Sequence, residues 1–173
     1  MKKIMILGAS ILQLPAIKKA KEMGLQVIAV DMDENAIGFK EEGIICEVIS
    51  TIDSEKILEA AKKHHIDGIM TLASDMPMRS VAIVAKEMGL VGISEETALK
   101  ATNKAEMRQC LKECGVPIPQ FFRVSSKEEY EKVFHNRPDL YYANDREEWK
   151  RITEVVMETM RRGEKGYKLA TRM

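Results

Sequence analysis

The chain has 173 residues, of which 45% are apolar and 31% charged, and its formal net charge is zero. This composition permits a packed core and excludes wholesale disorder, and the interspersed charges give no footprint for a nucleic acid or a membrane surface. No apolar run is long enough to span a bilayer, and no signal peptide is expected at the N-terminus. The three cysteines lack disulfide-framework spacing, which favours a reducing cytoplasm.

Short apolar runs alternate with helical patterns through the first ninety residues. The expected strands are 3–7, 26–30, 44–49 and 67–72, and the expected helices are 14–23, 54–63 and 77–88. Pro15 suits a first helical turn, Gly24 and Gly89 suit helix ends, and Asp53 or Ser54 suits an N-cap. The alternation predicts a three-layer α/β fold with a parallel sheet of at least four strands and helices on both faces.

The pattern becomes mostly helical after residue 93. A capping pattern begins at Ser94, a helix is expected over 104–114, and the prolines at 117 and 119 require extended backbone. A strand over 120–124 and a helix over 125–134 follow, and then a divergent tail contains an amphipathic helix over 146–162. We therefore divide the chain into an α/β domain 1–93, a second segment 94–135 and a helical tail 136–173.

Two polar turns are expected at the carboxyl edge of the sheet, where open α/β folds bind ligands. The turn Gly8-Ala9-Ser10 follows the first strand, but Ser10 and Gln13 replace the second and third glycines of a dinucleotide fingerprint. A pyrophosphate site, a small-ligand crevice and a plain turn all remain open. Asp31 ends the second strand, where an acidic residue would bind a ribose, although a polar loop also explains it.

The second polar turn, Ser74-Asp75, follows the fourth strand. The Asp75 carboxylate either holds a substrate amine or caps the helix that begins near Pro77. Away from this edge, Cys110 and Cys114 lie four residues apart on one helix face, which suggests two small core residues more than a metal site. His64-His65 is better explained by the solvation or the dipole of a helix end than by a metal.

A family resemblance rests on an ordered series of short motifs, each of which is weak alone. The series comprises 4–10, 20–24, 27–31, 74–75, 89–94, 102–108, 115–119 and 125–129. In this order the motifs resemble the N-terminal, pre-ATP-grasp domain of ATP-grasp enzymes, such as carbamoyl-phosphate synthase large subunits, biotin carboxylase and the purine-pathway ligases. The resemblance implies a cytoplasmic ligase that uses ATP and magnesium on a small-molecule substrate. The candidate substrate-binding residues are Gly8, Ala9, Ser10, Asp31, Ser74 and Asp75.

In the same resemblance, Lys104 matches a lysine that contacts the ATP phosphates, although a solvated lysine at a helix start is the alternative. The family's second ATP lysine, glycine-rich loop and magnesium ligands find no match in 136–173. The first hypothesis is therefore the N-terminal portion of an ATP-grasp ligase that is inactive alone. The second is a non-catalytic module that binds a small ligand or a partner. A Rossmann oxidoreductase is disfavoured by the missing glycines.

The expected helix 146–162 also bears on association. Large apolar side chains follow each other at spacings of three and four residues, namely Trp149, Ile152, Val156 and Met160. Such a stripe needs a partner surface. We expect a homodimer through this helix, or a monomer in which the helix folds back near residues 104–114.

Overall fold

The computed structural model describes residues 1–119, 121–124, 126, 128–129 and 132. Met1–Ile118 form one compact unit and Pro119–Met173 a second. The strands and labelled helices named below all belong to the first unit. The expected helix 146–162 and its apolar stripe lie outside the described residues.

Four parallel strands form the sheet. They are β1 (Lys3–Leu7), β2 (Gln26–Asp31), β3 (Ile45–Val48) and β4 (Gly68–Thr71), in the spatial order β3-β2-β1-β4. Strand β1 is central, with Leu7 opposite Val30 on one side and Thr71 on the other. Each strand matches its expected range within a few residues, because short apolar runs bounded by polar turns are typical of buried parallel strands.

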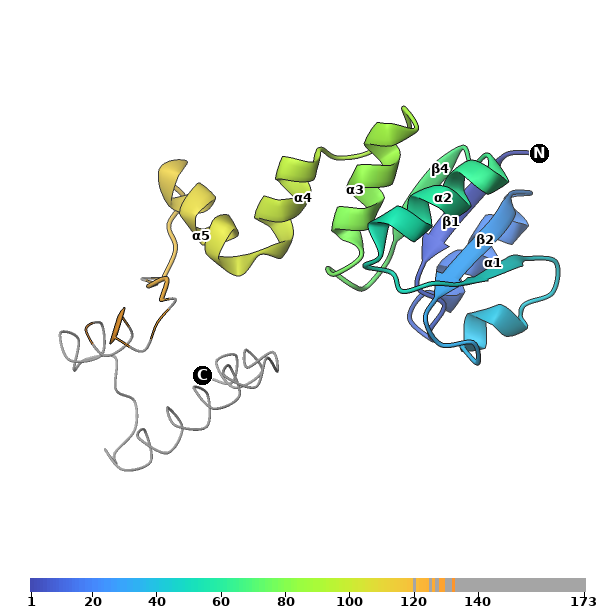
Figure 1. Ribbon diagram of the computed structural model, residues 1–173, viewed down its shortest axis with the longest axis horizontal. Coiled ribbons are helices and arrows are strands. Elements are labelled where there is room, and N and C mark those ends of the chain that lie inside the picture. The colour runs from blue at the N-terminus through green and yellow to red at the C-terminus, as the bar shows by residue number, and fades with distance from the viewer. Residues whose placement is uncertain (120, 125, 127, 130–131, 133–173) are drawn as a thin grey trace, which may run out of the picture. The chain divides into compact units, whose positions relative to one another are not determined.

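Helices cover both faces of the sheet (Figure 1), as the sequence predicts. Helix α1 (Leu14–Glu22) packs Ile17 and Ala20 on one face, together with the short 3-10 helix η1 (Ile37–Lys40) that follows β2. Helices α2 (Ser54–His64) and α3 (Met78–Glu87) pack on the other face around Ile57 and Val84. The three-layer α/β fold is confirmed.

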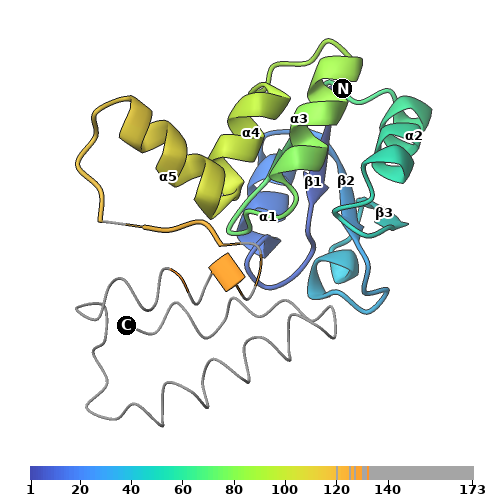
Figure 2. The ribbon, with the colours of Figure 1, turned by 60° about the vertical axis from the view of Figure 1, so that its left-hand side comes forward.

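Two further helices extend the unit beyond α3 (Figure 2). Helix α4 (Glu95–Thr102) begins at Ser94, whose Oγ accepts a hydrogen bond from the Thr97 N–H. Asn103 separates it from α5 (Lys104–Glu113) and caps α5 by accepting from the N–H groups of residues 105 and 106. These caps place the helix starts where the sequence predicts them.

The sequence-based expectations fail at two places in this part of the chain. Residues 121–124 are in no strand, because β-propensity favours extended backbone but the pairing that makes a strand is not encoded locally. The interpretation of Cys110 and Cys114 as core residues is also wrong, since Cys114 is exposed and α5 has no fully buried residue. Ser126 does accept from the Glu129 N–H, as the expected helix start requires.

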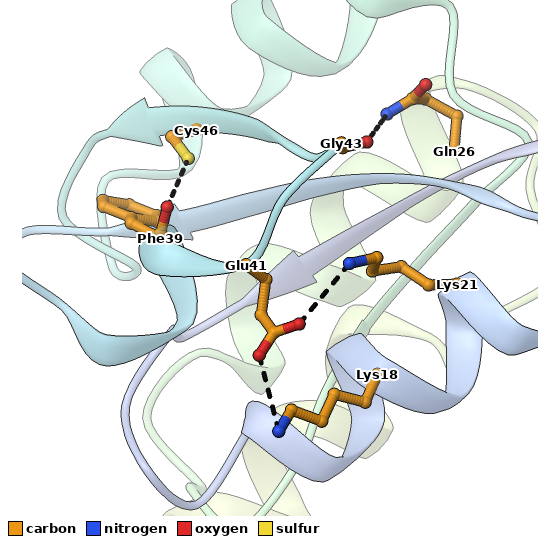
Figure 3. A network of polar contacts seen from close by, with 7 residues as sticks. All are labelled: Lys18, Lys21, Gln26, Phe39, Glu41, Gly43 and Cys46. Atoms are coloured by element: carbon orange, nitrogen blue, oxygen red, sulfur yellow. Dashed lines mark hydrogen bonds and ion pairs between the residues drawn. The ribbon is translucent and has the colours of Figure 1, made fainter.

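The segment that leads from β2 to the edge strand β3 is fastened by polar contacts (Figure 3). The Glu41 carboxylate lies 3.5 Å from Lys18 Nζ and 3.4 Å from Lys21 Nζ, so two of the three lysines of α1 meet one acid. The Gln26 side chain donates to the Gly43 carbonyl at 3.1 Å. The two ion pairs join this connection to α1, and the bond from Gln26 joins it to the start of β2.

A second polar cluster joins β3 to the end of α2. Glu47 Oε1 accepts a hydrogen bond from Lys63 Nζ at 2.8 Å and lies 2.6 Å from His64 Nε2. The hydrogen bond from Lys63, and then the one with His64, lowers the pKa of the Glu47 carboxyl. Because this pKa is lower in the folded chain than in the unfolded one, the stabilisation is present above the unfolded pKa of about 4.5 and is lost as the pH falls through the folded pKa.

We predict that Glu47→Gln lowers the free energy of unfolding at pH 7 by about 1 kcal/mol, since it removes a charge-assisted hydrogen bond. At pH 3 the difference between the two proteins should be smaller than at pH 7, because the stabilisation by the carboxylate is lost as the pH falls through the folded pKa. Urea unfolding at both pH values measures this. Glu59→Gln, at an exposed position of α2, is the control and should change stability little at either pH. An equal loss for Glu47→Gln at pH 3 would contradict the assignment.

Candidate functional site

The turn after β1 is built around a glycine that no other residue can replace without strain. Gly8 is buried with φ +102°, and its N–H donates to the Val30 carbonyl at 2.7 Å. A Cβ atom at this position would lie 2.8 Å from Gln13 Cδ. The positive φ and the close approach together account for the glycine.

Asp31, at the end of β2, closes the same turn. Its Oδ2 accepts a hydrogen bond from the Ala9 N–H at 2.7 Å, and its Oδ1 accepts from the Asp33 N–H at 3.1 Å. The Ala9 carbonyl in turn accepts from the Gly38 N–H at 2.7 Å. The Asp31 carboxylate thus accepts the hydrogen bond of the Ala9 N–H, a backbone donor that a phosphate group in this turn would need. This contact argues against a dinucleotide pyrophosphate site at the turn.

Gln13 connects this turn to the loop after β4, a role that the sequence did not reveal. Its side chain is only 4% exposed, although glutamine is polar. Ser10 Oγ donates to Gln13 Oε1 at 2.6 Å, and Gln13 Nε2 donates to the Leu72 carbonyl at 2.5 Å. The only sequence signal for Gln13 is its place in the fingerprint, where a glycine would stand.

The loop between β4 and α3 carries the second pair of expected site residues. Ala73 has φ +57°, an uncommon conformation for a residue with a Cβ. Ser74 and Asp75 follow it and are exposed. No side chain caps α3, and only the Asp75 carbonyl bonds to the helix start, through the Met78 N–H at 3.2 Å. The capping explanation of the Asp75 carboxylate is therefore not supported.

The structure links the two loops at the carboxyl edge but does not link Lys104 to them. Lys104 is the first residue of α5 and is exposed. Within the part of the chain that the structure describes, it makes no ion pair, and no hydrogen bond joins it to the β1 or β4 loops. Its ammonium is available to a ligand at the start of α5.

Large apolar side chains also lie in the loops at the carboxyl edge of the sheet. They come from the loops after all four strands, and each is more than two-fifths exposed: Ile11, Leu12, Met32, Ile52, Leu72 and Met76. Exposed apolar residues gathered in this way are typical of a surface that contacts a ligand or another protein surface. The edge thus combines an apolar rim with the Ser74 hydroxyl and the Asp75 carboxylate.

The histidines lie at the end of α2, as expected. His64 is its last residue and pairs with Glu47, and His65 follows with φ 51°. In the described part of the chain, no group of three or more His, Cys, Asp or Glu side chains could hold a metal ion. None of the helices described there is long and apolar enough to span a membrane.

Comparison of the sequence with curated proteins gives two significant relatives. The chain is 27% identical over 111 residues to the carbamoyl phosphate synthase large chain of Campylobacter jejuni, a match over 61% of this chain and 10% of that protein. It is 25% identical over 168 residues to the N-terminal section of the large chain from Methanopyrus kandleri, over 84% of this chain and 30% of that protein. The chain therefore spans less than a third of each relative. No protein-family model matches it.

Solved structures extend the likeness to the fold. Phosphoribosylglycinamide synthetase from Anaerococcus prevotii aligns with a TM-score of 0.65 and 28% identity, over 78% of this chain and 34% of that one. The chain carries a pre-ATP-grasp domain. N5-carboxyaminoimidazole ribonucleotide synthetase from Thermotoga maritima aligns similarly, with a TM-score of 0.62 and 25% identity over 78% and 36% of the two chains. The pre-ATP-grasp domain thus matches the N-terminal portions of ATP-grasp ligases in sequence and in fold.

The strained conformation of Ala73 gives a prediction about the β4 loop of this domain. A glycine adopts a positive φ without steric cost, so Ala73→Gly should raise the free energy of unfolding by up to about 1 kcal/mol, despite the greater freedom of the unfolded chain. Ala101→Gly, the same substitution in α4, should lower it by about 1 kcal/mol. Chemical denaturation of both variants measures the difference, and equal destabilisation by the two would reject the strain at Ala73.

Proposed function

We propose that this chain supplies the N-terminal, substrate-binding portion of an ATP-grasp ligase that joins a carboxylate to an amine or makes a carbamoyl phosphate. The observation that carries the proposal is the joint match in sequence and fold to carbamoyl phosphate synthase large chains and to phosphoribosylglycinamide synthetase. The complete reaction of such a ligase phosphorylates a carboxylate with ATP and passes the acyl group to a nucleophile. This chain would bind and orient the small-molecule substrate.

The carboxyl edge of the sheet is the substrate surface in this proposal. The Ser74 hydroxyl can donate or accept a hydrogen bond, and the Asp75 carboxylate can bind an amine. Gly8, Ala9 and Ser10 shape the floor of this surface, and Asp31 acts by fixing Ala9 instead of by touching the substrate.

ATP is the proposed second ligand, with Lys104 as its contact in this chain. The exposed ammonium at the start of α5 forms no ion pair with a described residue and suits a polyphosphate. Magnesium would accompany the nucleotide, but the described residues include no carboxylate cluster that could hold the metal. The nucleotide's own phosphates would then be the main magnesium ligands.

We predict that Lys104→Ala weakens the binding of magnesium-ATP about tenfold or more, since a hydrogen bond to a charged group is worth about 1.5–3 kcal/mol. Isothermal titration of the full chain measures the affinity. Lys112→Ala removes an exposed lysine from the last turn of the same helix and is the matched control.

Unchanged affinity in Lys104→Ala would remove this lysine from the site. Equal weakening in Lys112→Ala would indicate a general effect of charge. The same preparation should form no ADP when carboxylates and amines are added, because the sequence 136–173 has no recognisable glycine-rich loop or magnesium ligands. Stoichiometric ADP formation that depends on a carboxylate would contradict the proposal that the chain is inactive alone.

The alternative is a non-catalytic module that uses the same fold to bind a small ligand or a partner. The exposed apolar rim is the observation that favours it. Titration separates the two proposals, because a module of this kind would bind a carboxylate or an amine without any effect of magnesium-ATP. A ligase portion should show coupling between the two ligands.

Association through the sequence 146–162 is a further part of the proposal. The apolar positions 149, 152, 156 and 160 would bury side chains worth roughly 1.5–3 kcal/mol each against a second copy. We predict a homodimer by light scattering at micromolar concentration and its dissociation by Trp149→Glu with Val156→Glu. Arg151→Glu, on the opposite side of the expected helix, is the control and should leave the dimer intact. A monomeric mass that persists at high concentration would reject the dimer.

A further inference from the structure

Helix α5 presents two thiols on one side of the helix. Cys110 is half-buried and Cys114, the residue that ends the helix, is exposed, and neither forms a disulfide. The Cys114 N–H donates to the Cys110 carbonyl at 3.0 Å, which is the hydrogen bond between residues i and i+4 of an α-helix. The two side chains therefore lie one above the other on the same face.

This spacing disfavours a disulfide and favours a shared metal ion. Cβ atoms four residues apart on a helix are separated by about 5–6 Å. A disulfide needs about 3.5–4.5 Å between them. A metal ion with two metal–sulfur bonds of about 2.3 Å accepts sulfurs up to about 4.6 Å apart, which the side chains reach by rotation about χ1. The pair is arranged to chelate and not to crosslink.

The number of donors selects the metal. Zinc in a structural site requires four ligands, and the described residues offer no group of three or more His, Cys, Asp or Glu side chains near one another. Thiolates prefer soft ions, and Cu(I) is satisfied by two of them. The two cysteines on one face of α5 match that requirement.

The charge around Cys110 suits such a complex. Cu(I) held by two thiolates has a net charge of −1, so a nearby cation stabilises it. Lys100 of α4, the helix that packs against α5, is a cation of this kind, and its Nζ donates to Glu96 Oε1 at 2.6 Å.

We propose that Cys110 and Cys114 form a dithiolate site for a soft monovalent metal ion, Cu(I), on the face of α5. The third cysteine is a control within the same chain. Cys46 lies on β3, its Sγ donates to the Phe39 carbonyl at 3.8 Å, and burial raises the pKa of its thiol. A thiol that holds its proton more firmly is the poorer ligand.

The test is an anaerobic competition between the full, reduced chain and a chromophoric Cu(I) chelator. The wild-type chain should take one Cu(I) from the chelator, with an affinity that rises with pH because binding releases the thiol protons. Cys110→Ser and Cys114→Ser should each weaken binding by more than about 100-fold, since loss of a group outside the ligand shell alone costs about 10–100-fold. Cys46→Ser should bind as the wild type does.

Three results would overturn the proposal. The first is a wild-type affinity for Cu(I) no higher than that of the double variant, in which both Cys110 and Cys114 are replaced by serine. The second is full affinity in either single variant. The third is a loss of affinity in Cys46→Ser equal to the loss in the other two. Circular dichroism of each variant checks that the helix content is retained, so that a loss of binding is not caused by unfolding. Serine is accommodated at these half-buried and exposed positions without a cavity.

Discussion

Strand β1 is paired along both of its edges and covered on both of its faces, and this double burial sets the arrangement of everything around it. Met5 and Leu7 face the layer of α2 and α3, while Ile6 faces α1, and all three are fully buried. A parallel strand in this position requires a helix on each side of the sheet and a right-handed crossover to each neighbour. The order β3-β2-β1-β4 meets that requirement.

The same central position brings the candidate site together. Because parallel strands end at one edge, the turn after β1 lies between the end of β2 and the loop after β4. Asp31 reaches the turn from one side and Gln13 reaches the β4 loop from the other. The loops are therefore held by side-chain contacts between segments that are distant in sequence, and the exposed groups of the β4 loop are presented on a fixed base.

The sequence predicts the elements well and the contacts of the site less well. Apolar periodicity and helix caps such as Asp53, Ser94 and Asn103 are local signals, and they place the strands and helices within a few residues. The bond between Asp31 and Ala9 and the burial of Gln13 depend on segments that meet only in the folded chain. Residues 121–124 show the same limit, since extended propensity does not specify a pairing strand.

Of the four strands of the sheet, the central strand is also the first to be made during synthesis. Its neighbour β2 follows after about twenty residues, but β4 pairs with β1 only across a separation of 64 residues, as between Met5 and Ile69. Until β4 emerges from the ribosome, one edge of an apolar strand has no partner in the sheet. Unpaired edges of this kind recruit other chains. The topology thus makes the nascent chain most vulnerable to aggregation before residue 71 has been released, which is a natural stage for chaperone binding.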